Sequence, residues 1–408
     1  MDRRKFIKQG GLLGLLTLLQ ACRLTDFGRD RLGRQPTASP TATATQHPTF
    51  TPTATSSPSP TVPASTNTPV ASATPAEIPT VTPTSTFTPV PPPTTYPPGP
   101  PSKLGLFITR FHPKILEIVE LGKPAIIKTI EVDGGLAMGL KASSPTTLMI
   151  GRLTLGNLNL EIDPQPAVQD YLNKVLPLAT DTKRMDAFDG WEAYNEPIVD
   201  TPDKMKRLAD FEAERTRVLA ENGIRSVVGN FATGNPPLEL WPHFAPALDA
   251  IRQYNGYLGL HEYSAPVMQY YAEDLQPNND PGQGDEGWLT LRYRKVHRQH
   301  LIPMGFGDIP ILMTECGVDG LVQPRPGPEQ AGGWQDFIET WLNDGFRDHP
   351  AGVYMDQLIW YDQHLQQDNF VKGAAIFLAA SGDQRWDSYD ILGPNAGGMA
   401  DLLIQYLQ

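Results

Sequence analysis

The chain has 408 residues, 41 of them proline, and a formal net charge of −12 at pH 7. This length is enough for two ordinary domains, but the prolines are unevenly spread and divide the chain into segments 1–22, 23–102 and 103–408. Eight of the 33 basic and four of the 45 acidic residues precede residue 103, so the last segment has a net charge of −16. Such acidity disfavours nucleic acid and other anionic polymers as ligands, and a neutral substrate fits better.

Residues 1–22 have the pattern of an export signal. Adjacent Arg3 and Arg4 open a basic segment, an apolar run over 11–19 follows, and the segment ends with Leu19-Gln20-Ala21-Cys22. The run is shorter than the ~20 residues that span a bilayer. The arginine pair resembles the bacterial twin-arginine signal, and the last four residues resemble a lipobox. We therefore expect an exported protein, lipid-anchored through Cys22 at the outer face of the cell membrane or released outside the cell.

Residues 23–102 are expected to be a disordered linker. From about Gln35 to Ser102 the sequence consists mainly of Thr, Pro, Ser and Ala, without lysine or arginine. Such a segment cannot bury enough apolar surface to fold, and its prolines favour an extended chain. We therefore expect the linker to be an extended stalk, either bare or O-glycosylated.

Eight apolar runs alternate with helical patterns along 103–408. The runs are 104–111, 125–132, 147–152, 187–194, 224–230, 257–261, 309–313 and 371–378. The clearest helical patterns cover 166–178 and 202–222, and an insertion over 319–369 holds two more. This alternation indicates parallel strands joined by crossover helices. Eight repeats without a dinucleotide glycine fingerprint favour a closed (β/α)8 barrel over an open doubly wound sheet.

Polar residues stand where the predicted strands end. They are Arg110, His112, Asp133, Arg152, Asn195, Glu196, Asn230, His261, Tyr263 and Glu315. Barrel enzymes place their chemistry at the carboxyl ends of the strands, so we expect these side chains around one pocket. No His-Glu-x-x-His, Cys-x-x-Cys or calcium-loop pattern occurs, and we expect neither a metal nor another cofactor.

Three of these strand ends carry a family resemblance. Asn195-Glu196-Pro197 after the fourth strand, His261-Glu262-Tyr263 after the sixth and Glu315 after the seventh resemble the retaining glycoside hydrolases of clan A, the cellulase- and mannanase-type barrels. The resemblance covers 103–408 in strand order. It implies that Glu196 is the acid/base, that Glu315 is the nucleophile and that Tyr263 hydrogen-bonds the nucleophile.

The chemistry of retention suits these residue types. One carboxyl group must be protonated to donate to the leaving oxygen, and the other must be ionised to attack the anomeric carbon. Asn195 would bind the sugar 2-hydroxyl, and Tyr263 with Arg110 would keep Glu315 ionised. His261 would contact the sugar or bridge to Glu196, or be a structural histidine.

Each residue also has a plainer interpretation. Glu196 could be an acid ahead of the helix that starts near Thr201, and Glu315 a surface acid at a strand end. Arg152 is expected to pair with Asp133, and Cys316 to be a core thiol. Trp288 and Trp386 are candidates for sugar-stacking platforms, with ordinary packing as the alternative.

The sequence departs from the clan at the eighth strand. Clan A enzymes commonly end this strand with a tryptophan, whereas Phe377, Leu378 and Ala379 stand here. The alternative function is therefore a non-catalytic, cell-surface carbohydrate-binding protein on a degenerate barrel. In either case the expected partner is an oligo- or polysaccharide, which we expect to be β-linked if it is hydrolysed, and no obligate protein partner is evident from the sequence.

The lipobox resemblance predicts that Cys22 carries the lipid. Cells that express the wild-type chain and are fed a radiolabelled fatty acid should incorporate label into it, whereas C22A should remain unlabelled because it lacks the acceptor thiol. C316A, which changes the other cysteine, should label like the wild type. An unlabelled wild-type chain would reject the anchor.

Overall fold

The computed structural model describes residues 101–273, 284–346 and 349–408. The predicted signal, Cys22 and the linker up to residue 100 lie outside the described residues. Among the described residues, no helix is both long and apolar enough to cross a membrane.

Eight strands alternate with helices, as the sequence pattern predicts. The strands are β1 (Leu104–Ile108), β2 (Ile126–Thr129), β3 (Leu148–Gly151), β4 (Gly190–Trp191), β5 (Val227–Phe231), β6 (Tyr257–Ser264), β7 (Ile311–Val318) and β8 (Val371–Ala379). The α-helices are α2 (Pro113–Gly122), α3 (Gly134–Ser143), α4 (Gln165–Ala179), α5 (Thr182–Ala187), α6 (Pro202–Glu221), α7 (Ala245–Gln253), α8 (Arg292–Val296), α9 (Ile338–Asn343), α10 (Pro350–Gln367) and α11 (Met399–Leu407). Shorter helical turns are η1 (Leu238–Phe244), η4 (His297–Leu301), η5 (Trp334–Phe337) and η6 (Gln384–Tyr389).

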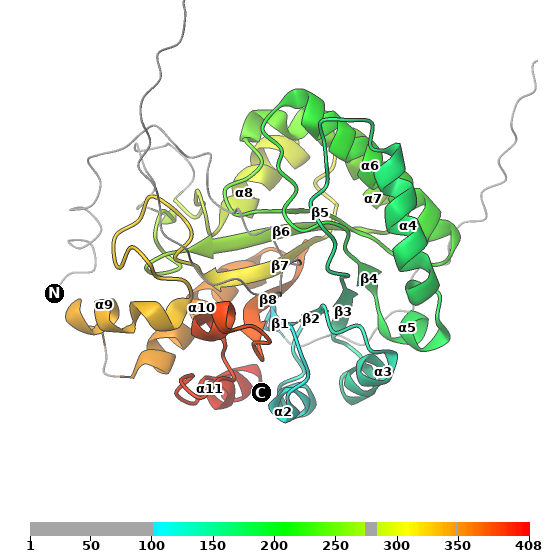
Figure 1. Cartoon of the computed structure of the whole chain (residues 1–408). Helices are drawn as coiled ribbons and strands as arrows, with labels where there is room; N and C mark the ends of the chain where they lie inside the picture. The colour runs from blue at the N-terminus through cyan, green and yellow to red at the C-terminus, as the bar shows by residue number, and fades with distance from the viewer. Residues whose placement is uncertain (1–100, 274–283, 347–348) are drawn as a thin grey trace, which may run out of the picture. The chain divides into compact units, whose positions relative to one another are not determined.

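The strands form one parallel sheet that closes into a barrel. Their order is β4-β3-β2-β1-β8-β7-β6-β5, so β1 pairs with β8. An isolated parallel bridge between Trp191 and Ser226 joins β4 to the start of β5. Figure 1 shows the strands at the centre with helices around them. The prediction of a (β/α)8 barrel is confirmed.

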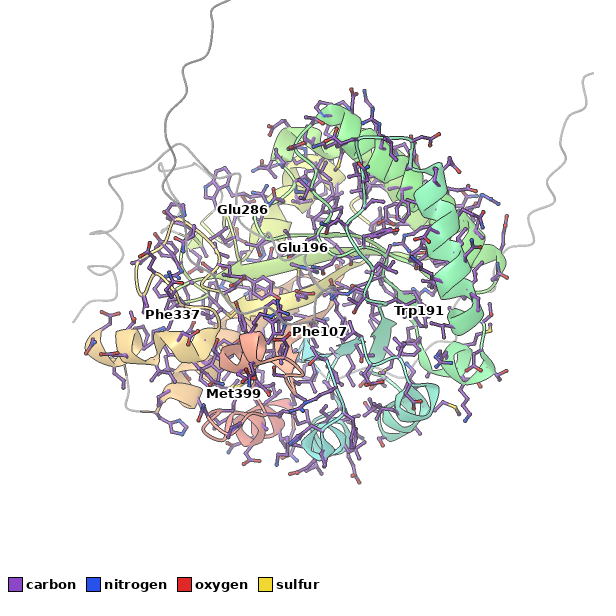
Figure 2. The ribbon with its side chains drawn as sticks, in the orientation of Figure 1. Phe107, Trp191, Glu196, Glu286, Phe337 and Met399 are labelled. Atoms are coloured by element: carbon purple, nitrogen blue, oxygen red, sulfur yellow. The ribbon has the colours of Figure 1, made fainter. Side chains whose placement is uncertain are left out.

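Strand alternation divides the core into two layers. Phe107, Ile126, Ile150 and Leu312 belong to a cluster inside the barrel. A larger cluster fills the space between the strands and the helices, and it includes Trp191. In Figure 2, Phe107 lies near the strands, whereas Phe337 and Met399 lie among the outer helices. Cys316 belongs to the outer layer and is fully buried, as expected for a core thiol.

Two bulges change the direction of side chains near the carboxyl ends of the strands. Along β6 and β7 the pairs are Leu260 with Met313 and then His261 with Glu315, so Thr314 is an extra residue on β7. Asn230 is likewise an extra residue on β5 and has a φ of 49°. A bulge reverses the alternation locally. Glu315 therefore faces the barrel interior while its neighbour Cys316 faces the helices.

Trp191 is predicted to stabilise the closure of the barrel. It is 1% exposed and packs against Phe188 with ring centroids 4.9 Å apart. W191A should lower the free energy of unfolding by about 3–5 kcal/mol through cavity formation. I162A, at a residue 56% exposed, is the control and should change it by less than about 0.5 kcal/mol. Equal midpoints in guanidinium chloride for wild type and W191A would contradict this role.

Candidate active site

Glu196 lies in the segment that follows β4. Its φ of 44° is in the left-handed region, and its backbone N–H donates to Asn230 O at 3.1 Å, so the β5 bulge holds it in place. The cap of α6 is Thr201 and the acid of its first turn is Asp203. Glu196 is therefore not the acid of that helix end, and its side chain is 12% exposed.

Glu315 points into the barrel from β7 and receives donors on both carboxylate oxygens. Lys128 Nζ lies 2.9 Å and Arg152 Nη1 3.2 Å from Oε1. Tyr263 donates its hydroxyl to Oε2 at 2.8 Å. With 5% of the residue exposed, Glu315 is not a surface acid at a strand end.

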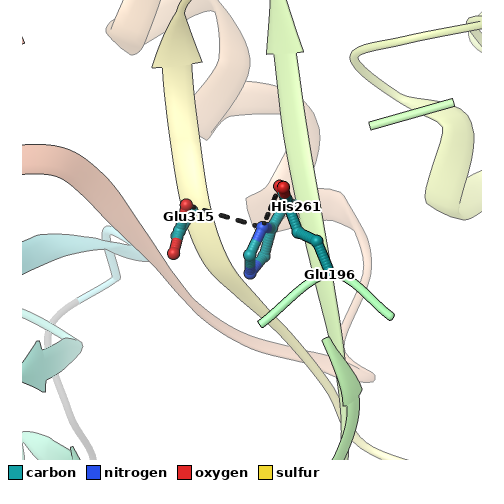
Figure 3. Close-up of side chains that lie close together, drawn as sticks. All are labelled: Glu196, His261 and Glu315. Atoms are coloured by element: carbon teal, nitrogen blue, oxygen red, sulfur yellow. Dashed lines mark hydrogen bonds and ion pairs between the residues drawn. The ribbon is translucent and has the colours of Figure 1, made fainter. Parts of the chain in front are cut away.

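One imidazole nitrogen links the two glutamates. His261 Nδ1 lies 2.8 Å from Glu196 Oε1 and 3.5 Å from Glu315 Oε2. Figure 3 shows these two contacts from β6 toward the carboxylates on either side. The structure thus brings together the three residues that the sequence analysis singled out at strands four, six and seven.

The environment of Glu315 favours its ionised form. Burial by itself raises the pKa of the carboxyl group, but Coulombic attraction to His261, Lys128 and Arg152 outweighs burial and holds the pKa below its usual range. Burial, followed by the proximity of Glu315, raises the pKa of Tyr263 well above its usual value, so Tyr263 stays a hydrogen-bond donor. Glu315 is therefore a carboxylate anion across the neutral range.

Two side chains of this charged cluster were not singled out from the sequence. Lys128 in β2 and Glu192, next to β4, are both fully buried, and Lys128 Nζ is 2.9 Å from Glu192 Oε2. A lysine inside an apolar run was the available signal, because a buried ammonium requires a carboxylate partner. Alternation points the same way, since Ile126 faces the interior and Lys128 is two residues further along.

Two expectations about arginines are wrong. Arg110 is exposed, with its Cδ near Gly382, and does not contact Glu315. Phe107 faces the interior, so Arg110, three residues on, falls on the opposite side of the chain. Asp133 caps α3 by accepting from Leu136 N, while Arg152 contacts Glu315 and Asn195 Oδ1 instead.

Aromatic rings pack around Tyr263, whose hydroxyl contacts Glu315. Phe377 of β8 is 9% exposed and contacts Phe107, Tyr263 and Trp386, with ring centroids 5.3, 6.1 and 5.1 Å away. Trp386 is half-buried at this cluster. Trp288 packs against the same cluster, and Lys295 Nζ lies 5.2 Å from its ring. Phe377 is thus the ring that β8 contributes to this aromatic cluster.

The donor set admits one further chemical interpretation. One ligand atom from each of Glu196, His261 and Glu315 lies within 4.8 Å of the other two, a spacing that a metal ion could use. However, Lys128 and Arg152 already neutralise Glu315, and their positive charges repel a divalent cation. The charges around Glu315 therefore favour a pair of carboxyl groups with different contacts over a metal centre.

No family model and no curated protein sequence matches the chain. Among solved structures it is similar to the β-glucuronidase of Ruminococcus gnavus, with 12% identity, a TM-score of 0.45, and 75% of this chain and 50% of that chain covered. It is also similar to a β-D-glucuronidase of Dictyoglomus thermophilum, with 11% identity, a TM-score of 0.45, and 75% of this chain and 50% of that chain covered. A glucosidase of Croceicoccus marinus is similar with 14% identity, a TM-score of 0.41, and 76% of this chain and 69% of that chain covered. The chain thus spans half the length of the two glucuronidases, and identities this low assign it no activity.

A third acid, Asp319, stands just after β7. It is 7% exposed, and its Oδ1 accepts from Leu321 N and from the Tyr389 hydroxyl, each at 2.8 Å. Burial raises the pKa of Asp319 to about 6, helped by the charge of Glu196 and opposed by the two hydrogen bonds. Asp319 therefore ties the loop after β7 to η6, which carries Trp386.

Asp319 should make stability depend on pH in the acid range. Its folded-state pKa of about 6 lies above the ~3.9 of an unfolded aspartate, so the folded state binds more protons between these values. Stability contributed by Asp319 is therefore complete below about pH 4 and decreases up to about pH 6. D319N can keep both hydrogen bonds on Oδ1 but does not titrate. Wild type should lose about 2 kcal/mol relative to D319N across this interval in denaturant unfolding, and parallel curves would contradict the assignment.

Proposed function

We propose that the chain hydrolyses O-glycosidic bonds of a neutral, β-linked carbohydrate with retention of anomeric configuration. The proposed acid/base is Glu196, and the proposed nucleophile is Glu315. The observation that carries the proposal is their separation, since one oxygen of each carboxylate lies within 4.8 Å of the other. Retaining sites place the carboxyl groups ~5–5.5 Å apart, and inverting sites ~6.5–9.5 Å to admit a water molecule.

The surroundings of the two carboxyl groups suit different tasks. Two cations contact Glu315, which favours the anion that attacks the anomeric carbon. Glu196 has His261 as its contact and is more exposed, at 12% of its side chain. A hydrogen bond donated by His261 Nδ1 to Oε1 would leave Oε2 of Glu196 free to hold the proton for the leaving oxygen. Different environments for two neighbouring acids are the usual basis for such a division of roles.

Other side chains are proposed to bind the sugar. Asn195, whose Oδ1 is held by Arg152, is placed beside Glu196 to contact a 2-hydroxyl. Trp386, half-buried against Phe377, is the better stacking platform. The ring of Trp288 already has Lys295 and Arg292 within 6 Å, at 5.2 and 5.9 Å, and those cations restrict a sugar's access.

The site is proposed to act outside the cell. The export signal, the lipid on Cys22 and the stalk would together hold residues 103–408 away from the membrane, where polysaccharides are accessible. The acidic charge of this segment agrees with a neutral rather than an anionic glycan.

Changing either glutamate should remove nearly all hydrolysis of aryl glycosides. E196A should lower kcat/KM by ~10²–10⁴, with the largest loss for leaving groups that need protonation. E315A should lose activity with every leaving group, because no nucleophile remains. E214A, which breaks an exposed ion pair with Arg217 on α6, is the control and should keep wild-type rates. Full activity in E196A or E315A would overturn the assignment.

The substrate can be identified by turnover. The panel consists of 4-nitrophenyl β-glycosides of glucose, mannose, xylose, galactose and glucuronic acid, together with β-mannan, β-glucan and xylan. We expect turnover of a neutral member. If the wild type is inert on the whole panel and binds a glycan array, the alternative of a non-catalytic carbohydrate-binding barrel is correct instead.

A further inference from the structure

A buried carboxylate next to β4, that of Glu192, shares the partners of the proposed nucleophile. Glu192 follows Trp191 at the end of β4 and is fully buried. Lys128 Nζ lies 2.9 Å from Glu192 Oε2 and 2.9 Å from Glu315 Oε1. Arg152 Nη1 lies 3.2 Å from Glu315 and 3.8 Å from Glu192. Two buried carboxylates thus divide two cations between them, and the four charges sum to zero.

Glu192 has no other visible task. Neither of its carboxylate oxygens accepts a hydrogen bond from any described residue, so the ion pairs with Lys128 and Arg152 are its only described polar contacts. Among the residues that the structure describes, it caps no helix and anchors no backbone amide through its side chain. Burying a carboxylate is costly, and here the only interactions that offset the cost also reach Glu315.

We propose that Glu192 is a positioning residue that tunes the nucleophile, by drawing Lys128 and Arg152 partly away from Glu315. This inference rests on the proposed retaining mechanism. A carboxylate that two cations bind without competition is a stabilised anion, which attacks poorly and leaves readily. Competition from Glu192 makes Glu315 a better nucleophile and keeps its ester to the sugar from leaving too early.

The charge changes of the two steps show what Glu192 does. In the first step, a Glu315 oxygen bonds to the anomeric carbon, the bond to the leaving oxygen breaks and Glu196 protonates that oxygen. Glu315 is then a neutral ester, and Glu192 is the remaining anion beside Lys128 and Arg152. In the second step, water attacks the anomeric carbon, Glu196 takes its proton and the carboxylate of Glu315 departs. The cluster therefore changes from neutral to +1 and back, whereas without Glu192 it would change from +1 to +2.

Other charged or titratable groups lie near this cluster and are not substituted in the variants below. Glu196, His261, Tyr263, Cys316 and Asp319 lie on the side of Glu315, and Tyr171, Glu212 and Arg215 lie on the side of Glu192. Arg215 is paired with Glu212 at 2.5 Å, and Tyr171 donates to the backbone oxygen of Glu192 at 3.1 Å. None of these interactions with α4 or α6 requires the carboxylate of Glu192 to be charged.

Leaving-group dependence tests the proposal directly. The substrates are 4-nitrophenyl and 2,4-dinitrophenyl glycosides of the sugar that wild type hydrolyses fastest. With E192Q, kcat/KM for the 4-nitrophenyl glycoside should fall by roughly tenfold, because attack by Glu315 weakens. With the 2,4-dinitrophenyl glycoside, for which departure of Glu315 limits turnover, kcat should hold or rise. Equal losses of both quantities indicate a merely structural residue and overturn the proposal.

The acid limb of the pH profile of kcat/KM gives an independent test, because the proposal fixes the direction in which each substitution moves it. K128M removes a cation from Glu315, so the acid limb of kcat/KM should move to higher pH by roughly one unit or more. Adding E192Q to K128M removes a nearby anion and should move the limb back down. A limb at the same pH in K128M and K128M/E192Q overturns the proposal.

Controls distinguish a failure of this proposal from misfolding of a variant and from a failure of the proposed function. E214Q, which neutralises an exposed partner of Arg217, should leave both readouts unchanged, and circular dichroism shows whether each variant is folded. If K128M does not fold, the charge-balanced double variant is compared with E192Q and should show the limb at higher pH; identical limbs overturn the proposal. An inert wild type refutes the retaining mechanism and this inference together, whereas an active wild type with parallel losses in E192Q refutes this inference alone.

Discussion

The contact on which the site depends is that of the Lys128 ammonium with two carboxylates, each 2.9 Å away, inside the barrel. Burial alone would favour a protonated Glu315, and the cations reverse that preference. Removing one partner from a buried ion pair commonly costs about 3–5 kcal/mol, so the four charges form a unit rather than separate contacts. Glu196 stands outside this unit and contacts His261 instead. The two glutamates therefore have different environments, which is the basis for proposing Glu315 as the ionised acid and Glu196 as the proton carrier.

The barrel brings these charges together through small irregularities in its strands. Lys128, Arg152 and Glu192 reach the interior by ordinary alternation from β2, β3 and β4. Glu315 reaches it because Thr314 is an extra residue on β7. On β5, the extra residue Asn230 presents its carbonyl oxygen to Glu196 N. The closed sheet thus supplies the frame, and the bulges direct the two glutamates toward each other.

Much of the fold was predictable, because eight apolar runs separated by helical patterns admit few arrangements of this length. The convergence of Glu196, His261 and Glu315 was predictable for the same reason, since all three end or follow the predicted apolar runs 187–194, 257–261 and 309–313. Which arginine contacts Glu315, Arg110 or Arg152, was not predictable. The answer depends on whether each side chain faces the barrel interior, and this is fixed only once Phe107 and Ile150 are known to face it. Lys128 and Glu192 were overlooked because each lies inside its run rather than at a strand end, and their pairing across β2 and β4 is a contact that no local pattern contains.

As the proposed nucleophile, Glu315 should attack as an ionised carboxylate and form an ester with the sugar. The most direct measurement is mass spectrometry of peptides after incubation with a 2,4-dinitrophenyl 2-deoxy-2-fluoro-β-glycoside of the sugar that the chain hydrolyses. The fluorine of such a substrate slows both the formation and the hydrolysis of the ester. The dinitrophenyl leaving group speeds only the formation, so the ester accumulates. We expect one added fluoroglycosyl group, on the peptide that contains Glu315. A label on another residue, or turnover of the unmodified substrate without any labelling, would contradict it.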